Sequence, residues 1–97
     1  MKQDHIYYID NIPYITVESF AIRTNRKQET IRKLVRQGNA IRKLKAIKLR
    51  NYLLTPESEI YDYPFVEPGK IGKEIHYHRY KKDGGIELLV IPLHMSK

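Results

Sequence analysis

Two short runs of β-prone residues open the chain, and a turn-forming pair separates them. Residues 5–15 read HIYYIDNIPYI, in which Asp10-Asn11 lies between the two runs. Asp and Asn suit the backbone of tight turns, so this segment predicts a β-hairpin. Pro13 cannot donate a hydrogen bond to a neighbouring strand, which predicts that the second run is short or lies at a sheet edge.

Two helices are predicted next. Thr16 is a favourable N-cap for a helix through VESFAIR. A second helix is predicted from about Lys27 to Gln37, and Gly38-Asn39 would end it because both residues tolerate the left-handed conformation. Each helix has apolar residues at helical spacing, which predict its buried face. They are Val17, Phe20 and Ala21 in the first helix and Ile31, Leu34 and Val35 in the second.

The second half of the chain predicts mostly strands. The segments AIRKLKAIKL (40–49) and YLLT (52–55) read as two strands joined by a tight turn at Arg50-Asn51. Pro56 would open a short helix, PESEIYD, since Pro fits the first position of a helix. Residues 63–72 are rich in proline and glycine and predict a connector. Within residues 73–93, EIHYHRYKK and IELLVI flank the turn DGG, which is a strong hairpin signal.

The composition is that of one globular domain. The chain has 97 residues and no cysteine, which predicts a single domain over residues 1–97 without disulfides or thiolate metal ligands. The N-terminal residues lack the pattern of a signal peptide. The longest apolar run, LLVIPL, is far shorter than the roughly 18 residues of a membrane-spanning helix. We therefore expect a cytoplasmic protein with no membrane partner.

Positive charge is concentrated in the middle of the chain. The window from Arg23 to Arg50 holds eleven basic residues and one acidic residue, Glu29, so its net charge is 11 − 1 = +10. The rest of the chain has 7 basic and 10 acidic residues, or −3, which gives the formal total of +7. Charge gathered in this way predicts a surface for a polyanion, although membrane surfaces and acidic proteins attract the same charge.

The basic window also has the spacing of a helix-turn-helix. Ala21 is small enough for close contact between two helices, and Asn25 tolerates positive φ in the turn. Ile31 and Leu34 would face back toward Phe20. An ordinary pair of antiparallel helices would have the same features, so this spacing alone leaves both interpretations open.

Three segments within residues 13–62 extend this pattern: YITVESFA, ETIRKLVRQGNAI and AIKLRNYLLTPESEI. Together they resemble the winged helix-turn-helix of the MerR and phage excisionase superfamily. The resemblance implies an α+β winged helix-turn-helix, to which this chain adds a C-terminal β-hairpin. It also implies that the second helix lies in the DNA major groove and that the wing follows the backbone or minor groove. Two departures are Lys27, where Ser or Thr usually caps the recognition helix, and Arg26, where a small apolar residue is common.

The candidate DNA contacts are the polar residues of the second helix and the wing. Gln28, Arg32 and Arg36 recur at four-residue steps and form one stripe. Gln can pair with adenine and Arg with guanine, so this stripe predicts base reading. The other cations predict contacts to the DNA backbone. They are Arg26, Lys27, Lys33, Arg42, Lys43, Lys45, Lys48 and Arg50. The alternatives are a solvated helix face and lysines that protect an edge strand from aggregation.

Other candidate sites are weaker. His76, His78 and His94 could meet in a metal site, but no cysteine joins them, so we interpret them as solvated or packed and expect no metal or cofactor. No order of catalytic residues is convincing, so we expect no enzyme activity. The apolar residues of the C-terminal hairpin could complete the domain's own sheet or form a dimer surface. We expect one face to pack internally, with the other face available to a partner.

The sequence predicts a sequence-preferring double-stranded DNA-binding protein with a regulatory or architectural role, such as a repressor or an excisionase-like factor of a phage or plasmid. One helix-turn-helix reads few base pairs, which favours a homodimer or cooperative self-association on DNA. MerR regulators carry a long coiled coil and an effector domain that this chain lacks, so no small-molecule effector is expected. The alternative function is a protein-interaction adaptor or inhibitor that docks its basic winged helix on an acidic partner.

Overall fold

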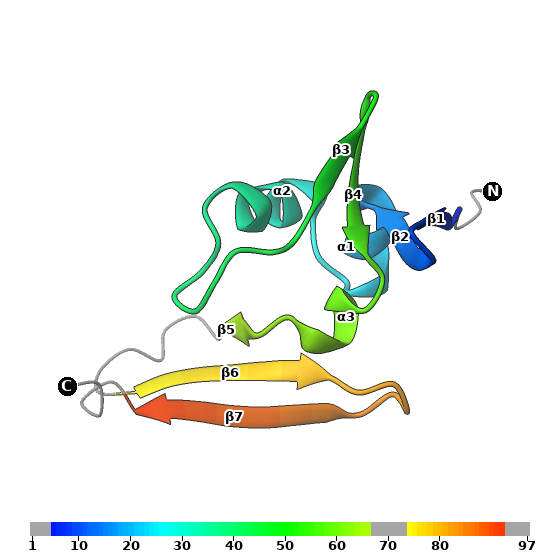
Figure 1. Cartoon of the computed structure of the whole chain (residues 1–97). Helices are drawn as coiled ribbons and strands as arrows, with labels where there is room; N and C mark the ends of the chain where they lie inside the picture. The colour runs from blue at the N-terminus through cyan, green and yellow to red at the C-terminus, as the bar shows by residue number, and fades with distance from the viewer. Residues whose placement is uncertain (1–4, 67–73, 93–97) are drawn as a thin grey trace.

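The computed structural model describes residues 5–66 and 74–92, which form two antiparallel sheets and three short helices. The strands are β1 (Tyr7–Ile9), β2 (Ile12–Thr16), β3 (Ile47–Leu49), β4 (Tyr52–Pro56), β5 (Phe65–Val66), β6 (Glu74–Tyr80) and β7 (Ile86–Pro92). The helices are α1 (Val17–Arg23), α2 (Gln28–Arg36) and α3 (Glu59–Asp62). The first sheet has the order β1-β2-β4-β3 and the second β5-β6-β7. The β3–β4 hairpin projects at one end of the molecule, and β6 and β7 lie at the opposite end (Figure 1).

The prediction of a winged helix-turn-helix with an additional C-terminal β-hairpin is wrong. The described chain is a mixed α+β structure rich in strands, and its two antiparallel sheets organise it. The helices have only seven, nine and four residues, too few to form a helical layer. The resemblance to winged helices covered residues 13–62 alone, so it took no account of the strands on either side. These strands extend the first sheet at β1 and build a second sheet from β5, β6 and β7.

The first hairpin forms where Asp10-Asn11 predicts it, and its two turn residues have φ of 54° and 67°. Pro13 predicted a strand that is short or lies at a sheet edge; β2 has only five residues, but it lies between β1 and β4 and is not an edge strand. Pro13 follows the pair Ile9–Ile12 that closes the turn, so its nitrogen faces the β4 side. The registered pairs with β4 begin at Tyr14, and the Pro13 carbonyl accepts a hydrogen bond of 2.9 Å from the Glu57 amide beside them. Proline therefore costs this ladder only the hydrogen bond that an amide at its last position would donate.

The two helices begin close to their predicted starts. Thr16 caps α1 as predicted, because its hydroxyl accepts a hydrogen bond of 3.1 Å from the Ser19 amide. Asn25, in the turn between the helices, has φ of 57°. Lys27 is the N-cap of α2 without a side-chain hydrogen bond, so this helix starts at Gln28, one residue later than predicted. The helix ends at Arg36, one residue before the predicted Gln37, and Gly38 follows with φ of 78°, the left-handed conformation that was predicted to end it.

One apolar core joins the helices to both sheets. The rings of Phe20 in α1 and Phe65 in β5 lie 6.4 Å apart, and Tyr63 meets Phe65 edge to face at 5.1 Å. Leu34 and Val35, which the spacing predicted to be buried, are half-buried at the margin of this core. The fully buried members are Ile15, Val17, Phe20, Ala21, Ile31, Leu44, Ile60, Tyr63 and Phe65.

The predicted strand over residues 40–49 is wrong for most of its length, because β3 starts only at Ile47. The preceding backbone bonds to side chains and to α2 instead of to a strand. The side-chain oxygen of Asn39 accepts from the Ile41 amide at 2.9 Å, and the Leu44 amide donates to the Leu34 carbonyl at 3.0 Å. The predicted helix start at Pro56 is also wrong, since Pro56 ends β4 and α3 begins at Glu59.

The C-terminal hairpin forms around DGG as predicted, but it does not pack as expected. His78 and Tyr80 of β6 meet the core, where the ring centres of His78 and Phe65 lie 5.8 Å apart. Ile86, Leu88 and Val90 of β7 are 56%, 73% and 48% exposed. The expectation that one face of the hairpin packs internally therefore fails for β7, which lies beyond β6 at the outer edge of the second sheet. Residues 67–72 of the predicted connector, residues 73 and 93 of the predicted hairpin, and His94 lie outside the described residues.

Tyr63 should make stability depend on alkaline pH. Burial raises the pKa of Tyr63 to about 12, and its hydroxyl donates a hydrogen bond of 2.8 Å to the Arg42 carbonyl. A folded pKa above the unfolded value of about 10 favours the folded state fully below pH ~10, and this contribution is lost as pH rises toward ~12. Tyr63→Phe should cost about 1 kcal/mol at neutral pH.

Urea unfolding of both proteins at pH 7, 9 and 11 measures this effect. The stability gap between wild type and Tyr63→Phe should narrow at the highest pH, because only the wild type has a phenol to ionise at position 63. The Arg42 carbonyl keeps a second donor, the Asn39 amide at 3.1 Å, in the variant. A gap that stays constant with pH would contradict the assignment to Tyr63.

Candidate nucleic-acid interface

The two basic elements, α2 and the β3–β4 hairpin, border the same surface cavity. A cavity of about 410 Å³ lies between α2 and the β3–β4 hairpin, with the start of α1 as its third side. Arg32 of α2 and Lys48 of β3 both line it, together with Asn51 and Tyr52 from the hairpin. The acidic residue Glu18 of α1 also lines it. Arg32 and Lys48 therefore lie beside the same open space although they come from different elements.

The predicted base-reading stripe is present on α2. Gln28, Arg32 and Arg36 are all exposed, and Ile31 on another face of the helix is buried. Their four-residue spacing aligns the three side chains along one face. A helix that buries one face in the core and leaves a row of long polar side chains free has the shape needed to enter a groove.

The β3–β4 hairpin carries its own exposed cations. Lys45, Lys48 and Arg50 are exposed, and Arg50 has φ of 57° in the two-residue turn between Leu49 and Tyr52. An Arg at this turn adopts the left-handed conformation at some energetic cost, which Asn or Gly would largely avoid. The hairpin projects away from the second sheet (Figure 1), so its cations are accessible from outside.

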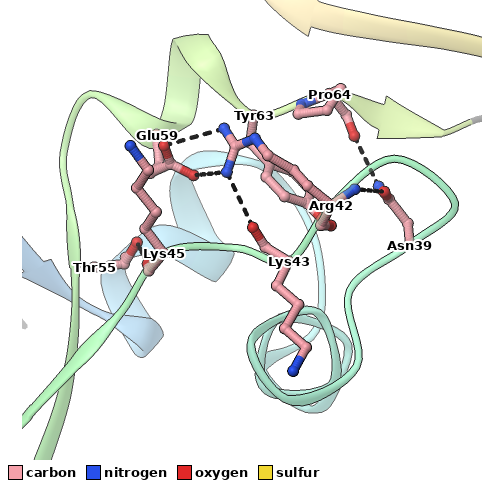
Figure 2. Close-up of polar contacts among 8 residues, drawn as sticks. All are labelled: Asn39, Arg42, Lys43, Lys45, Thr55, Glu59, Tyr63 and Pro64. Atoms are coloured by element: carbon pink, nitrogen blue, oxygen red, sulfur yellow. Dashed lines mark hydrogen bonds and ion pairs between the residues drawn. The ribbon is translucent and has the colours of Figure 1, made fainter.

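Arg42, predicted as a DNA-backbone contact, is half-buried and is bound by groups of the protein itself. Its guanidinium donates to both carboxylate oxygens of Glu59, at 3.0 and 3.2 Å, and to the Lys43 carbonyl at 3.0 Å (Figure 2). It also lies 5.0 Å from the ring centre of Tyr63. The Glu59 side chain is only 3% exposed. Arg42 therefore neutralises a buried carboxylate, and we leave it out of the interface.

Arg26, a second predicted backbone contact, is also held by the protein. Its guanidinium carbon lies 4.0 Å from the ring centre of Phe65, and the group donates to the Tyr80 hydroxyl at 2.8 Å and the Thr24 carbonyl at 2.9 Å. His78 lies 3.4 Å away on the same side. These contacts connect the turn between α1 and α2 to the second sheet, so Arg26 too is left out of the interface.

The remaining predicted cations are free of carboxylate partners within residues 5–66 and 74–92. The ion pairs of this part join Arg23 to Glu57, Arg42 to Glu59, His76 to Glu74 and Arg79 to Glu87. The predicted contact residues that are exposed cations outside these pairs are Lys27, Arg32, Lys33, Arg36, Lys43, Lys45, Lys48 and Arg50. A surface of unpaired cations is expected to attract a polyanion.

Sequence reasoning missed the cavity and two of its lining residues, Asn51 and Tyr52. Asn51 was assigned to the turn only, and Tyr52 to a strand, where it is 51% exposed. The approach of the hairpin to α2 has no signature in the local sequence, because it depends on how the first sheet packs on the helices. An exposed aromatic residue next to a basic turn is the one signal that could have suggested a binding surface.

Residues 5–66 and 74–92 contain no group of three or more His, Cys, Asp or Glu side chains that could hold a metal ion. No helix among them is long and apolar enough to cross a membrane.

Comparison of the chain with protein-family models, with curated proteins and with solved structures found no match.

Proposed function

We propose that this chain binds duplex DNA through α2 and the β3–β4 hairpin. The observation that carries the proposal is that Arg32 and Lys48, from the two elements, line one cavity while neither has a carboxylate partner in the described residues. In this arrangement Lys48 is placed to contact a phosphate while Arg32 reaches the base edges beside it. The basic window of +10 supplies the wider attraction.

In this proposal α2 reads base edges in the major groove, and the hairpin contacts the backbone beside it. The major groove admits one α-helix, and an Arg side chain can donate two hydrogen bonds to a guanine edge. Gln28, Arg32 and Arg36 are the proposed base-reading residues. The proposed backbone contacts are Lys27, Lys33, Lys43, Lys45, Lys48 and Arg50. A regulatory or architectural role, as a repressor or an excisionase-like factor, rests on the sequence resemblance alone.

Arg32→Ala tests the proposed reading of bases. If Arg32 reads a guanine, the variant should lose about 1–3 kcal/mol of binding free energy on the preferred site and lose its preference at one base position. The preferred site is first selected from a random duplex pool with the wild-type protein, and mobility shifts then measure both proteins on that site and on its single-base variants.

Lys81→Ala is the matched control, because it removes an exposed cation at the turn of the β6–β7 hairpin. It should leave binding almost unchanged. An equal loss for Arg32→Ala on all duplexes would reassign Arg32 to a phosphate contact. If the wild-type pool yields no preferred sequence and binding stays weak, the proposal fails and the adaptor function, with an acidic protein as partner, takes its place.

A further inference from the structure

Among residues 5–66 and 74–92, no strand pairs with the outer edge of β7. β7 is the last strand of the second sheet, and β6 is its neighbour on the inner side. The turn of this hairpin fixes which backbone groups point outward. The Lys81 amide donates to the Gly85 carbonyl at 2.9 Å, and the Gly84 amide donates to the Lys81 carbonyl at 3.0 Å, so Lys81 and Gly85 form the first bonded pair.

Bonded and non-bonded pairs alternate along an antiparallel ladder. The registered pairs Arg79–Glu87, Tyr77–Leu89 and Ile75–Ile91 are therefore bonded within the hairpin. The residues between them on β7 direct their amide and carbonyl groups to the open edge. These residues are Ile86, Leu88, Val90 and Pro92.

The open edge has few of the features that protect edge strands from pairing. Such strands usually carry Lys, a bulge or Pro. The residues of β7 whose backbone groups point to the open edge have apolar side chains. Among them only Pro92, at the end of the strand, has no amide hydrogen to donate. The one charged residue of the strand, Glu87, points to the other face of the sheet and is paired with Arg79 at 3.1 Å. Leu88, at the middle of the edge, is 73% exposed.

We propose that β7 pairs in an antiparallel manner with β7 of a second copy of this chain, so that two three-stranded sheets become one continuous sheet. The charge distribution favours a second copy at this edge. Residues 74–92 contain three basic and three acidic residues, 3 − 3 = 0, whereas the window from Arg23 to Arg50 carries +10. Two copies that meet at β7 thus join neutral surfaces and keep their basic surfaces apart.

The pairing has a preferred register. When Leu88 of one protomer lies opposite Leu88 of its partner, Ile86 lies opposite Val90, and every outward amide of these residues finds a carbonyl. A register centred on Leu89 instead would bring Pro92 opposite Ile86, where proline has no hydrogen to donate. The first register also brings three apolar side chains of each copy together on one face of the sheet, where their contact removes apolar surface from water.

A single-cysteine variant tests the register, since the natural chain has no cysteine. Two residues that form a bonded antiparallel pair have Cα atoms about 5.5 Å apart, within the range of a disulfide. Leu88→Cys should therefore form a disulfide-linked dimer under mild oxidation, in proportion to the dimer present. The control is Tyr8→Cys on β1, the edge strand of the other sheet, because Tyr8 is 70% exposed. Tyr8→Cys should form several-fold less cross-linked dimer.

The mass of the protein in solution gives a second readout. Sedimentation of the wild type should show a shift from 11.6 kDa to twice this mass with rising concentration. Leu88→Lys should stay monomeric at concentrations where the wild type is dimeric, and Tyr8→Lys should behave as the wild type does. Circular dichroism should be unchanged, because Leu88 is a surface residue. If Leu88→Lys unfolds, the comparison of cross-linking in Leu88→Cys and Tyr8→Cys decides whether β7 is the contact between copies.

Two results would overturn the proposal. One is a wild type that remains monomeric up to about 1 mM, a concentration at which even weak association is detected. The other is equal cross-linking of Leu88→Cys and Tyr8→Cys. Both tests use the protein without DNA, so their results are independent of whether the proposed DNA binding is correct.

Discussion

Arg42→Ala should lower the free energy of unfolding by about 3 kcal/mol, because it leaves the buried Glu59 carboxylate without its partner. Removal of one member of a buried ion pair typically costs about 3–5 kcal/mol. The lower end applies here, since Arg42 is 33% exposed and water can reach part of the site. Urea unfolding followed by circular dichroism measures the change.

Two control variants separate the buried charge from the loss of side-chain packing. Lys43→Ala removes the neighbouring, exposed cation and should change stability by less than about 0.5 kcal/mol. The double variant Arg42→Ala with Glu59→Gln should be more stable than Arg42→Ala alone, because no unpaired carboxylate remains. If the double variant is the less stable of the two, the Arg42 guanidinium stabilises the fold mainly through its contacts with Tyr63 and the backbone.

Replacement of Lys45, Lys48 and Arg50 by Gln should weaken binding to every duplex by about 3 kcal/mol, or roughly a hundredfold, at about 0.1 M salt. The proposed interface has six backbone contacts, which predict a slope of about −5 for log K against log salt. The triple variant should reduce the slope to about −2.5 and leave the order of preferred sequences unchanged, because phosphate contacts carry no sequence information.

A control for charge alone is the double variant Lys81→Gln and Lys82→Gln. It removes two exposed cations from the turn of the C-terminal hairpin, at the opposite end of the molecule from the β3–β4 hairpin (Figure 1). Its salt slope should match that of the wild type. A triple variant with an unchanged slope would mean that the β3–β4 hairpin does not face the DNA.

Local chemistry made several elements predictable from the sequence. The turn at Asp10-Asn11, the cap at Thr16 and the helix end at Gly38 each depend on the conformational preferences of one or two residues. The exposed stripe on α2 was predictable for the same reason, since helical spacing alone decides which side chains share a face. Such features need no knowledge of how distant segments pack.

Features that depend on distant contacts were not predictable. Arg42 and Glu59 are 17 residues apart, and Arg26 and Tyr80 are 54 apart, so nothing near either arginine indicates a role in the interior. The alternating pattern of residues 40–46 resembled a strand. The side-chain oxygen of Asn39 instead accepts hydrogen bonds from the Ile41 and Arg42 amides, and these hold the backbone in another conformation. The same lack of long-range information led to the wrong fold, since the division of the strands between two sheets is a property of the whole chain.

The contacts of Arg26 have a consequence for any paired form of the protein. The residue lies in the turn just before α2, yet its guanidinium is fixed on Phe65 and Tyr80 of the second sheet. This side chain therefore connects the start of α2 to the sheet whose outer strand is the proposed contact between two copies. In such a pair the connection would hold the two α2 helices at a set distance from each other. Paired half-sites at one spacing would then be bound by both copies together, and half-sites at other spacings by one copy at a time.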